Sequence, residues 1–291
     1  MDTLGLIILN YNSADDSIYC VSKLLEVQEP YKIIIVDNCS TDDSYEVLQN
    51  RFKNENKVDL IKTDSNRGYS AGNNFGIKYA IEKYGVTHVG ILNPDVIISN
   101  KMLLGNMLSI LDRHINAAII GGATQNPEGV YNENIAAWNV PTGIGLVLDH
   151  LLFLPKKRKL KVVPVEKDVV QVGCVMGCFF LAKVPMLEAM GFLDENIFLY
   201  NEENVLGIKC KQHGYQVLLY EEGYYIHNHK HLNNAKIPFK KKVMATHNSY
   251  ISRKYLCENY YPKYVLPLLD CAELLNKLYL IMAYMWSRVK K

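Results

Sequence analysis

Residues 33–43 read IIIVDNCSTDD, an unbroken apolar run that ends at Asp37 and continues into small polar residues. A short, fully apolar run bounded by polar residues is typical of a buried strand in a parallel sheet. Amphipathic spacing follows over Thr41–Phe52, so this stretch predicts a strand, a turn and a helix. Repetition of that unit builds an α/β sheet with crossover helices.

The same alternation continues on both sides of this unit. The predicted strands are Leu4–Leu9, Lys32–Val36, Val58–Ile61, Val89–Leu92 and Ala117–Ile120, and the predicted helices are Ala14–Val27, Thr41–Phe52, Gly72–Lys83 and Lys101–Arg113. In such sheets, residues just past the carboxyl ends of the strands line one crevice, where ligands bind. We therefore expect a binding crevice formed by residues 10–12, 37–38, 66–68 and 93–95.

The second half of the chain is less regular. Periodicity is weak from Gln125 to Asp168, where we expect loops and short hairpins. Further strands are predicted at Val169–Gly173, Phe179–Ala182 and Val217–Tyr220, and further helices at Pro185–Met190, at Glu202–Gln212 and from about Phe239 onward.

Composition excludes several classes of protein. With 49% hydrophobic and 21% charged residues over 291 positions, the chain is expected to be globular, and a net charge of +2 demands no nucleic-acid partner. Scattered cysteines and the lack of an export signal favour the cytoplasm. Asp270, Glu273 and Lys277 interrupt the C-terminal apolar stretch that could otherwise span a bilayer, so the chain should be soluble or attached to a membrane surface.

Three strand ends carry residues suited to chemistry. Asp37 could accept from the imide N–H of uracil or thymine, whereas Ser40 and Thr41 could simply cap the next helix. The glycine-containing segment 66–74 opens a helix and suits a phosphate, although a plain turn is the alternative. Asp95, after Asn93 and Pro94, suits a divalent cation, and a proline-started turn is its alternative.

Taken together, residues 10–12, 36–42, 66–74 and 92–95 resemble the family 2 glycosyltransferases in both order and spacing. The resemblance covers the region from the first strand to about His231. It implies a GT-A fold, a Rossmann-like and mostly parallel central sheet flanked by helices, with a nucleotide-diphospho-sugar donor and inversion at the sugar carbon. It also implies a catalytic domain over residues 1–235, with a nucleotide-binding half at 1–122 and an acceptor-side half at 123–235. A helical region follows at 236–291.

The resemblance assigns roles to individual residues. It implies that Asp95 binds Mg²⁺ or Mn²⁺. The residues implied to bind the nucleotide-sugar are Asn10, Tyr11, Asn12, Asp37, Asn66, Arg67, Gly68, Ala71, Asn74 and Asn93. The family usually has Asp-x-Asp at the metal motif, and the Asn93-Pro94-Asp95 form here is similar to the rhamnosyltransferase-like branch, which uses dTDP-L-rhamnose. A dTDP donor is therefore ranked first and a UDP donor second.

The acceptor side carries the remaining candidates. Met176 and Gly177 match a segment where a small residue leaves room for the incoming sugar, and Glu203 matches the catalytic Asp, with Glu202 as its rival. A second family Asp falls on Val205, so that part of the pattern is missing. His227 is expected to complete the metal or pyrophosphate site.

Alternatives to these assignments remain at the sequence level. His229 is the rival of His227, and alternating His227, His229 and His231 would also suit zinc. A sugar-nucleotide pyrophosphorylase is disfavoured, because residues 10–16 contain neither glycine nor a basic residue. A non-catalytic carbohydrate-binding subunit is the other functional class. The acceptor is expected to be a saccharide or a lipid-linked sugar, with Lys240–Lys242 and the tail from Tyr260 able to contact a membrane unless they serve ordinary helix packing.

Overall fold

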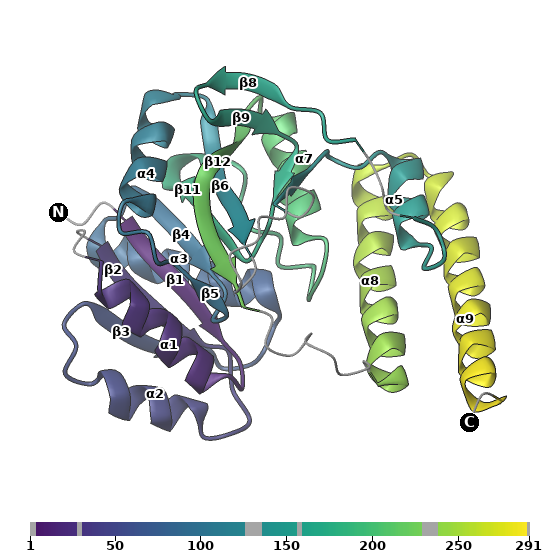
Figure 1. The fold of residues 1–291 in the computed structure, drawn as a ribbon, viewed down its shortest axis with the longest axis horizontal. Coiled ribbons are helices and arrows are strands. Elements are labelled where there is room, and N and C mark those ends of the chain that lie inside the picture. Colours follow the sequence, from purple (N-terminus) through teal and green to yellow (C-terminus); the bar gives the residue numbers. More distant parts are fainter. Residues whose placement is uncertain (1–3, 28–30, 126–135, 156–158, 229–237, 290–291) are drawn as a thin grey trace.

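The computed structural model describes residues 4–27, 31–125, 136–155, 159–228 and 238–289 (Figure 1). His229 and His231 lie outside these ranges, so the alternatives that involve them concern residues outside the described part of the chain. A large sheet with helices on both faces forms the main body, and a group of helices stands at one end of it.

The main sheet runs in the order β3-β2-β1-β4-β11-β6-β12-β9-β8, with β5 paired to β12. Strands β3, β2, β1 and β4 are mutually parallel, β11 is antiparallel to its neighbours, and β6 and β12 are parallel. The strands in this sheet are β1 Leu4–Asn10, β2 Tyr31–Asp37, β3 Val58–Lys62, β4 His88–Leu92, β5 Val96–Ile97, β6 Ala117–Gln125, β8 Val163–Glu166, β9 Val169–Val172, β11 Phe179–Lys183 and β12 Gln216–His227. A separate pair joins β7 Ala137–Trp138 to β10 Cys174–Val175.

Helices cover both faces of this sheet because its strands are apolar on both sides. One core cluster packs Val21, Leu48 and Met107 against the sheet, and the other packs Ile77, Leu187 and Leu206. The helices are α1 Ala14–Leu25, α2 Ser44–Phe52, α3 Tyr69–Tyr84, α4 Leu103–Arg113, α5 Gly143–His150, α6 Val184–Ala189, α7 Glu202–Gln212, α8 Phe239–Tyr260 and α9 Val265–Val289. The predicted GT-A class, a mostly parallel sheet with flanking helices and a C-terminal helical part, is confirmed.

The turn after β2 does not follow the alternative in which Ser40 or Thr41 caps the next helix. Helix α2 begins at Ser44 with Asp43 as its N-cap residue, three residues later than predicted. The backbone N–H and hydroxyl of Ser40 donate instead to the Asp37 carboxylate, and the Thr41 N–H donates to Asn12 Oδ1 at 2.8 Å. Ser40 and Thr41 therefore organise the strand-end crevice and cap no helix.

Strands β6 and β12 extend further than the sequence pattern indicated. Strand β6 continues through Gly121 and Gly122, two positions where a larger residue would not fit. A Cβ at position 121 would lie 2.7 Å from Val175, and a Cβ at position 122 would lie 2.3 Å from the Gly223 carbonyl oxygen. A register shift between Tyr220 and Tyr224 then lets β12 keep pairing with β6 as far as Ile226. This continuation carries His227 to the strand-end crevice.

Helix α5 was missed by the prediction of loops over Gln125–Asp168. Its eight residues include Gly143 and Gly145, which disfavour a helix, so local propensity gave no signal. The Thr142 hydroxyl caps the helix by accepting from the Gly145 N–H at 3.0 Å, and Leu146 and Val147 are buried against α8 and α9. Tertiary packing against α8 and α9 therefore stabilises this helix.

Buried polar contacts join α9 to α5, and the Tyr255 and Tyr260 hydroxyls of α8 donate to Asp194 on the main body. His150 on α5 contacts Glu273 on α9 at 2.9 Å, and both side chains are almost fully buried. Asn276 accepts from the Leu152 N–H and donates to the His150 carbonyl oxygen. The boundary predicted at residue 236 remains a prediction. No helix in the described part of the chain is both long enough and apolar enough to cross a bilayer.

Candidate active site

The carboxyl ends of β1 and β2 bring two predicted binding residues, Asn10 and Asp37, into one network with Ser40. Asn10 and Asp37 are register partners, and the Asn10 side-chain amide donates to Asp37 Oδ2 at 2.9 Å. Ser40 donates to the same carboxylate through its hydroxyl at 2.6 Å and through its N–H at 3.0 Å. Asp37 is fully buried with three hydrogen bonds, so at most about one of a carboxylate's four lone-pair sites remains for a ligand.

The loop before α3 joins this network through Asn38. The Asn38 amide donates to Asn66 Oδ1 at 3.0 Å, and Asn66 in turn accepts from the Gly68 N–H. Gly68 has φ +95°, and a Cβ there would lie 2.3 Å from the Phe198 carbonyl oxygen. The next residue, Tyr69, donates its N–H to that same oxygen at 3.0 Å. Glycine at position 68 therefore lets the donor-side loop contact the acceptor-side segment around residue 198.

The other predicted nucleotide-binding residues are more scattered. Tyr11 is exposed just past β1, Asn12 is tied to Thr41, and Ala71 lies in the first turn of α3. The Asn93 N–H donates to the Cys178 carbonyl oxygen. Asn74 and Arg67 both contact Glu195, and the Asn74 amide also exchanges hydrogen bonds with the Leu193 backbone. The Asn74 side chain is therefore committed to the 193–195 segment, while its nucleotide role remains a prediction.

Asp95 and His227 meet just past the carboxyl end of β4, where β5 pairs with β12. The short strand β5 pairs with β12 so that His227 faces Val96, which places His227 Nε2 3.3 Å from Asp95 Oδ2. The Asn228 N–H also donates to the Asp95 carbonyl oxygen. Within the described ranges no cluster of three or more His, Cys, Asp or Glu side chains is arranged to hold a metal. A carboxylate with one imidazole nevertheless fits Mg²⁺ or Mn²⁺ when a diphosphate supplies further oxygens.

Glu203 lies on the first turn of α7 and reaches the loop before β11. Its Oε1 accepts from the Gly177 N–H at 3.2 Å, and a Cβ at position 177 would lie 2.8 Å from that oxygen. The space left by Gly177 is thus occupied by the Glu203 side chain, whereas the sequence had suggested room for a sugar. Met176, the other predicted acceptor residue, packs partly buried against the core. Burial raises the pKa of Glu203, and the Gly177 N–H opposes that shift.

Glu202, the rival of Glu203, has a different environment. Its Oε1 is buried without a hydrogen-bond partner. Burial, and then the neighbouring Glu203 charge, raise the pKa of Glu202. Both carboxylates accept backbone hydrogen bonds, but the charge on Glu203 raises the pKa of Glu202, so the two share a negative charge unequally. We therefore place the charge on Glu203 and the proton on Glu202.

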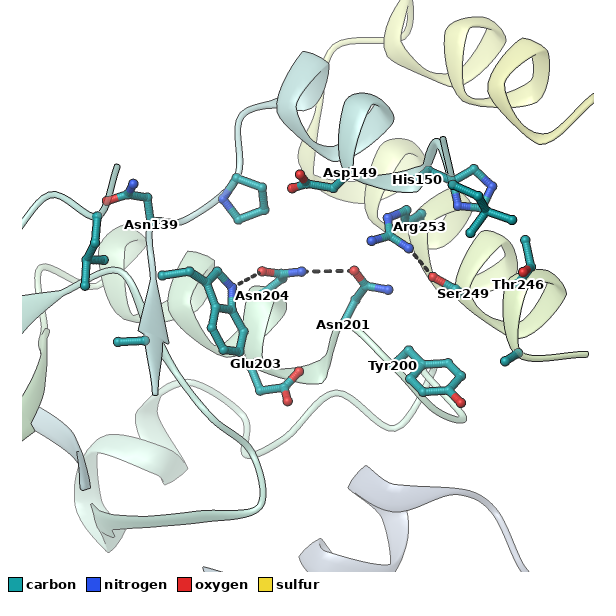
Figure 2. A pocket seen from close by; sticks show the side chains of 16 residues that line it. Asn139, Asp149, His150, Tyr200, Asn201, Glu203, Asn204, Thr246, Ser249 and Arg253 are labelled. Carbon is teal, nitrogen blue, oxygen red and sulfur yellow. Dashed lines mark hydrogen bonds between the residues drawn. The ribbon is translucent and has the colours of Figure 1, made fainter. Parts of the chain in front are cut away.

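A pocket of about 610 Å³ opens beside Glu203, between the main body and the C-terminal helices (Figure 2). Glu203, Asn204 and Asn201 form one wall, and α5 and α8 form the facing wall. The Trp138 indole donates to Asn204 Oδ1 at 2.8 Å, and Asn204 donates to Asn201 Oδ1 at 2.9 Å. A carboxylate at the edge of a polar pocket of this size can remove a proton from a bound hydroxyl.

Several residues of this site were absent from the sequence predictions. Tyr69 donates its hydroxyl to the Gly177 carbonyl oxygen at 2.5 Å and so supports the loop that contacts Glu203. Asn201, at φ +67°, donates to Ser252 on α8 at 2.7 Å. The Asn-Glu-Glu-Asn run at 201–204 was a usable signal for Asn201 and Asn204. Nothing in the pattern of α8 marked Arg253, because only the tertiary fold brings it to the pocket.

Comparison with known proteins shows that the chain is similar to glycosyltransferases. The family model described as "Glycosyl transferase family 2" matches residues 6–183. The low-salt glycan biosynthesis hexosyltransferase Agl10 of Haloferax volcanii is 30% identical over 208 residues, covering 70% of this chain and 60% of that protein. The N-acetylglucosaminyl-diphospho-decaprenol L-rhamnosyltransferase of Mycobacterium tuberculosis is 24% identical over 246 residues, covering 79% and 77%. The chain thus spans less than two thirds of the length of the first of these relatives.

Solved structures agree on the fold. The mannosyltransferase PcManGT from Pyrobaculum calidifontis, in complex with GDP-Man and Mn²⁺, superposes with a TM-score of 0.54 at 13% identity, over 93% of this chain and 73% of that one. GalNAc-T7 with UDP, GalNAc and Mn²⁺ gives 0.60 at 12% identity, over 93% and 54%. At these identities the likeness concerns the fold alone.

Proposed function

The chain belongs to glycosyltransferase family 2, and from this premise we propose that it transfers a sugar from a nucleotide diphosphate to an acceptor hydroxyl with inversion. The observation that carries the proposal is the placement of Glu203 in the wall of the 610 Å³ pocket. The Asp95–His227 pair supports it from the strand-end crevice.

The proposed reaction is a single displacement. The acceptor oxygen bonds to the sugar carbon while the bond from that carbon to the diphosphate oxygen breaks, and the bonding electrons leave with the nucleotide diphosphate. Glu203 takes the acceptor proton. A divalent cation at Asp95 and His227 would supply charge neutralisation for the leaving diphosphate. The crevice around Asn10, Asp37 and Asn66 would hold the nucleoside.

We propose dTDP-L-rhamnose as the first donor to test and UDP-hexoses as the second. The Asn93-Pro94-Asp95 motif supports rhamnose, and one relative is named as an L-rhamnosyltransferase while another is named as a hexosyltransferase. A mass-spectrometric assay of UDP-, dTDP- and GDP-sugars with Mn²⁺ tests the activity itself. Neither hydrolysis nor transfer from any of them would favour the non-catalytic carbohydrate-binding alternative.

Replacing Asp37 by Ala should weaken binding of dTDP or UDP by about tenfold to a hundredfold, since hydrogen bonds to charged groups contribute about 1.5–3 kcal/mol. Affinity would fall because a hydrogen bond to the base is removed, or because Asn10 and Ser40, which Asp37 holds in place, are released. Calorimetry with dTDP, UDP and GDP measures it. Asp42→Ala is the matched control, because Asp42 lies in the same loop but its carboxylate accepts from Ser44. Tighter binding of GDP than of dTDP and UDP would contradict the assignment of the base.

We further propose a saccharide or lipid-linked acceptor in cell-surface polysaccharide synthesis, and a cytoplasmic enzyme held at a membrane surface through its C-terminal helices. Helix α9 exposes an apolar row, and at least two fifths of each side chain is accessible: Leu268, Leu274, Leu275, Leu278, Ile281, Met282, Met285 and Trp286. Phe239 at the start of α8 contacts Tyr284, with ring centroids 4.7 Å apart. Exposed Lys240–Lys242 therefore lie beside the far end of α9, so basic charge and apolar surface coincide.

The protein should sediment with anionic vesicles at low salt and stay in solution with neutral ones. Changing Ile281, Met282 and Met285 to Ser should abolish the binding, and changing Lys240–Lys242 to Gln should reduce it and remove its salt dependence. Ile115→Ser is the control, because Ile115 is 80% exposed but follows α4 on the main body. Equal recovery in the supernatant with and without anionic lipid would count against membrane attachment.

A further inference from the structure

Arg253 is a partly buried cation that the proposed chemistry does not use. It lies on α8 and lines the 610 Å³ pocket opposite Asn201 and Asn204 (Figure 2). Its Nη1 donates to the Ser249 hydroxyl, and among the described residues this is its only hydrogen bond. Its Nε is buried without a partner. A guanidinium carries five N–H donors, so most of its capacity is unused.

Such an arrangement is costly for the folded protein. Burial lowers the pKa of Arg253 to about 10, and the nearby Asp149 charge offsets only part of this effect. Buried ionised groups are normally paired and hydrogen-bonded, because desolvation is expensive. Polar groups left unsatisfied at a pocket wall are typical of a site that a ligand completes.

The neighbouring groups determine which ligand fits. Asp149 and Glu203 also line the pocket, while His150 is already engaged by Glu273. A neutral sugar would leave the guanidinium largely unsatisfied, whereas a phosphate or carboxylate matches its planar donors in pairs. We infer that Arg253 binds an anionic group of the acceptor, so that the acceptor class is an acidic one: a sugar on a lipid diphosphate or an acidic sugar. This inference rests on the proposed glycosyl transfer.

The pocket extends along α8 toward Lys240–Lys242, and this orientation favours a sugar on a lipid diphosphate over an acidic sugar. Ala245, Thr246, Ser249 and Arg253 form one stripe along α8 that lines the pocket and leads toward Lys240–Lys242. Lys242 and Arg253 are eleven residues apart, about 16 Å along a helix at 1.5 Å per residue. A diphosphate bound at Arg253 would therefore place an attached lipid toward the end of the helices where basic and apolar residues coincide, with the sugar toward Glu203.

Calorimetry on the full chain, in EDTA so that no metal is bound at Asp95, tests this with inorganic pyrophosphate, geranyl diphosphate, geraniol and glucuronate. Pyrophosphate and geranyl diphosphate should bind and geraniol should not. Arg253→Met should weaken binding at least tenfold, Arg253→Lys should weaken it less, and Arg113→Met should leave it unchanged, since Arg113 pairs with Glu166 away from the pocket. Glucuronate binding that depends on Arg253, without diphosphate binding, would assign the anion to an acidic sugar. Failure of every anion to bind, or equal binding by Arg253→Met, would overturn the inference.

Thermal unfolding separates a binding role from a structural one. Without anion, Arg253→Met should unfold at the same or a higher temperature, because it removes a partly buried and poorly satisfied charge. Pyrophosphate should raise the unfolding temperature of the natural protein and not that of the variant. A variant that unfolds at a clearly lower temperature would instead make Arg253 a structural residue. If pyrophosphate binds through Arg253 while no nucleotide diphosphate binds with Mn²⁺, the proposed function fails and the anion site stands.

Discussion

Replacing Glu203 by Gln should lower turnover on the order of 10²-fold or more, about 2.7 kcal/mol in the activation free energy, while donor affinity is largely kept. Glutamine retains an oxygen that can accept from the Gly177 N–H, so the loop before β11 should stay in place. What it lacks is the ability to take the acceptor proton. Steady-state transfer kinetics, together with calorimetry of donor binding, separate the two effects.

Glu202→Gln is the matched control, because it changes the neighbouring residue on the same helical turn. Glu202 is inferred to be protonated already, so a neutral amide replaces a neutral acid and turnover should fall much less. Near-normal transfer by Glu203→Gln together with an inactive Glu202→Gln would move the base to Glu202.

The pH profile gives a second readout for the same residue. A general base works when deprotonated, so activity should be lost as the pH falls through the pKa of Glu203 in the folded protein. Burial raises that pKa above the ordinary carboxyl value, so the acid limb should lie above the range of an exposed carboxyl group. The limb should disappear from the residual activity of Glu203→Gln. An acid limb that is unchanged in the variant would assign it to another group.

Sequence periodicity was sufficient for the central strands of the sheet, because β1, β2 and β4 are buried on both faces and read as continuous apolar runs, whereas β5 and the more exposed β8 were not predicted. The strand-end residues followed from the same logic, and the structure brings Asn10, Asp37, Asn38 and Asn66 into one network. Helix boundaries were less predictable. Helix α3 begins at Tyr69 instead of Gly72, since the contact of Tyr69 with Phe198, more than a hundred residues away, fixes its first turn.

Features that depend on distant pairing could not be derived from local pattern. Helix α5 exists because α8 and α9 bury its apolar face, although its glycines argue against a helix. His227 reaches Asp95 only because β12 continues past an irregularity and pairs with β5. Val205, where the family pattern has a second Asp, is buried in the cluster that joins α7 to the C-terminal helices. A carboxylate there would be excluded from solvent, so its loss is consistent with the packing.

Replacing Asp95 by Ala should abolish most turnover, on the order of 10²-fold or more, because it removes the carboxylate that would share a divalent cation with the donor diphosphate. No third His, Cys, Asp or Glu side chain among the described residues joins Asp95 and His227 in a metal-binding arrangement, so the remaining imidazole should hold the cation poorly. Titration with Mn²⁺ followed by electron paramagnetic resonance, in the presence of UDP or dTDP, should show weaker metal binding by the variant. Transfer by the natural protein should likewise fall in excess EDTA and return with Mn²⁺ or Mg²⁺.

The control for Asp95→Ala is Asp112→Ala, which breaks another aspartate–histidine contact of nearly the same length. His88 Nε2 lies 3.2 Å from Asp112 Oδ1, but His88 begins β4 whereas Asp95 follows the end of that strand. The two contacts therefore lie toward opposite ends of one strand, and only one of them is in the crevice. Loss of a surface contact alone should affect both variants alike and modestly, while loss of a metal ligand should affect Asp95→Ala and leave Asp112→Ala active. Full activity of Asp95→Ala, or of the natural protein in excess EDTA, would exclude the cation from this mechanism and leave His227 and the backbone of α3 as the groups facing the diphosphate.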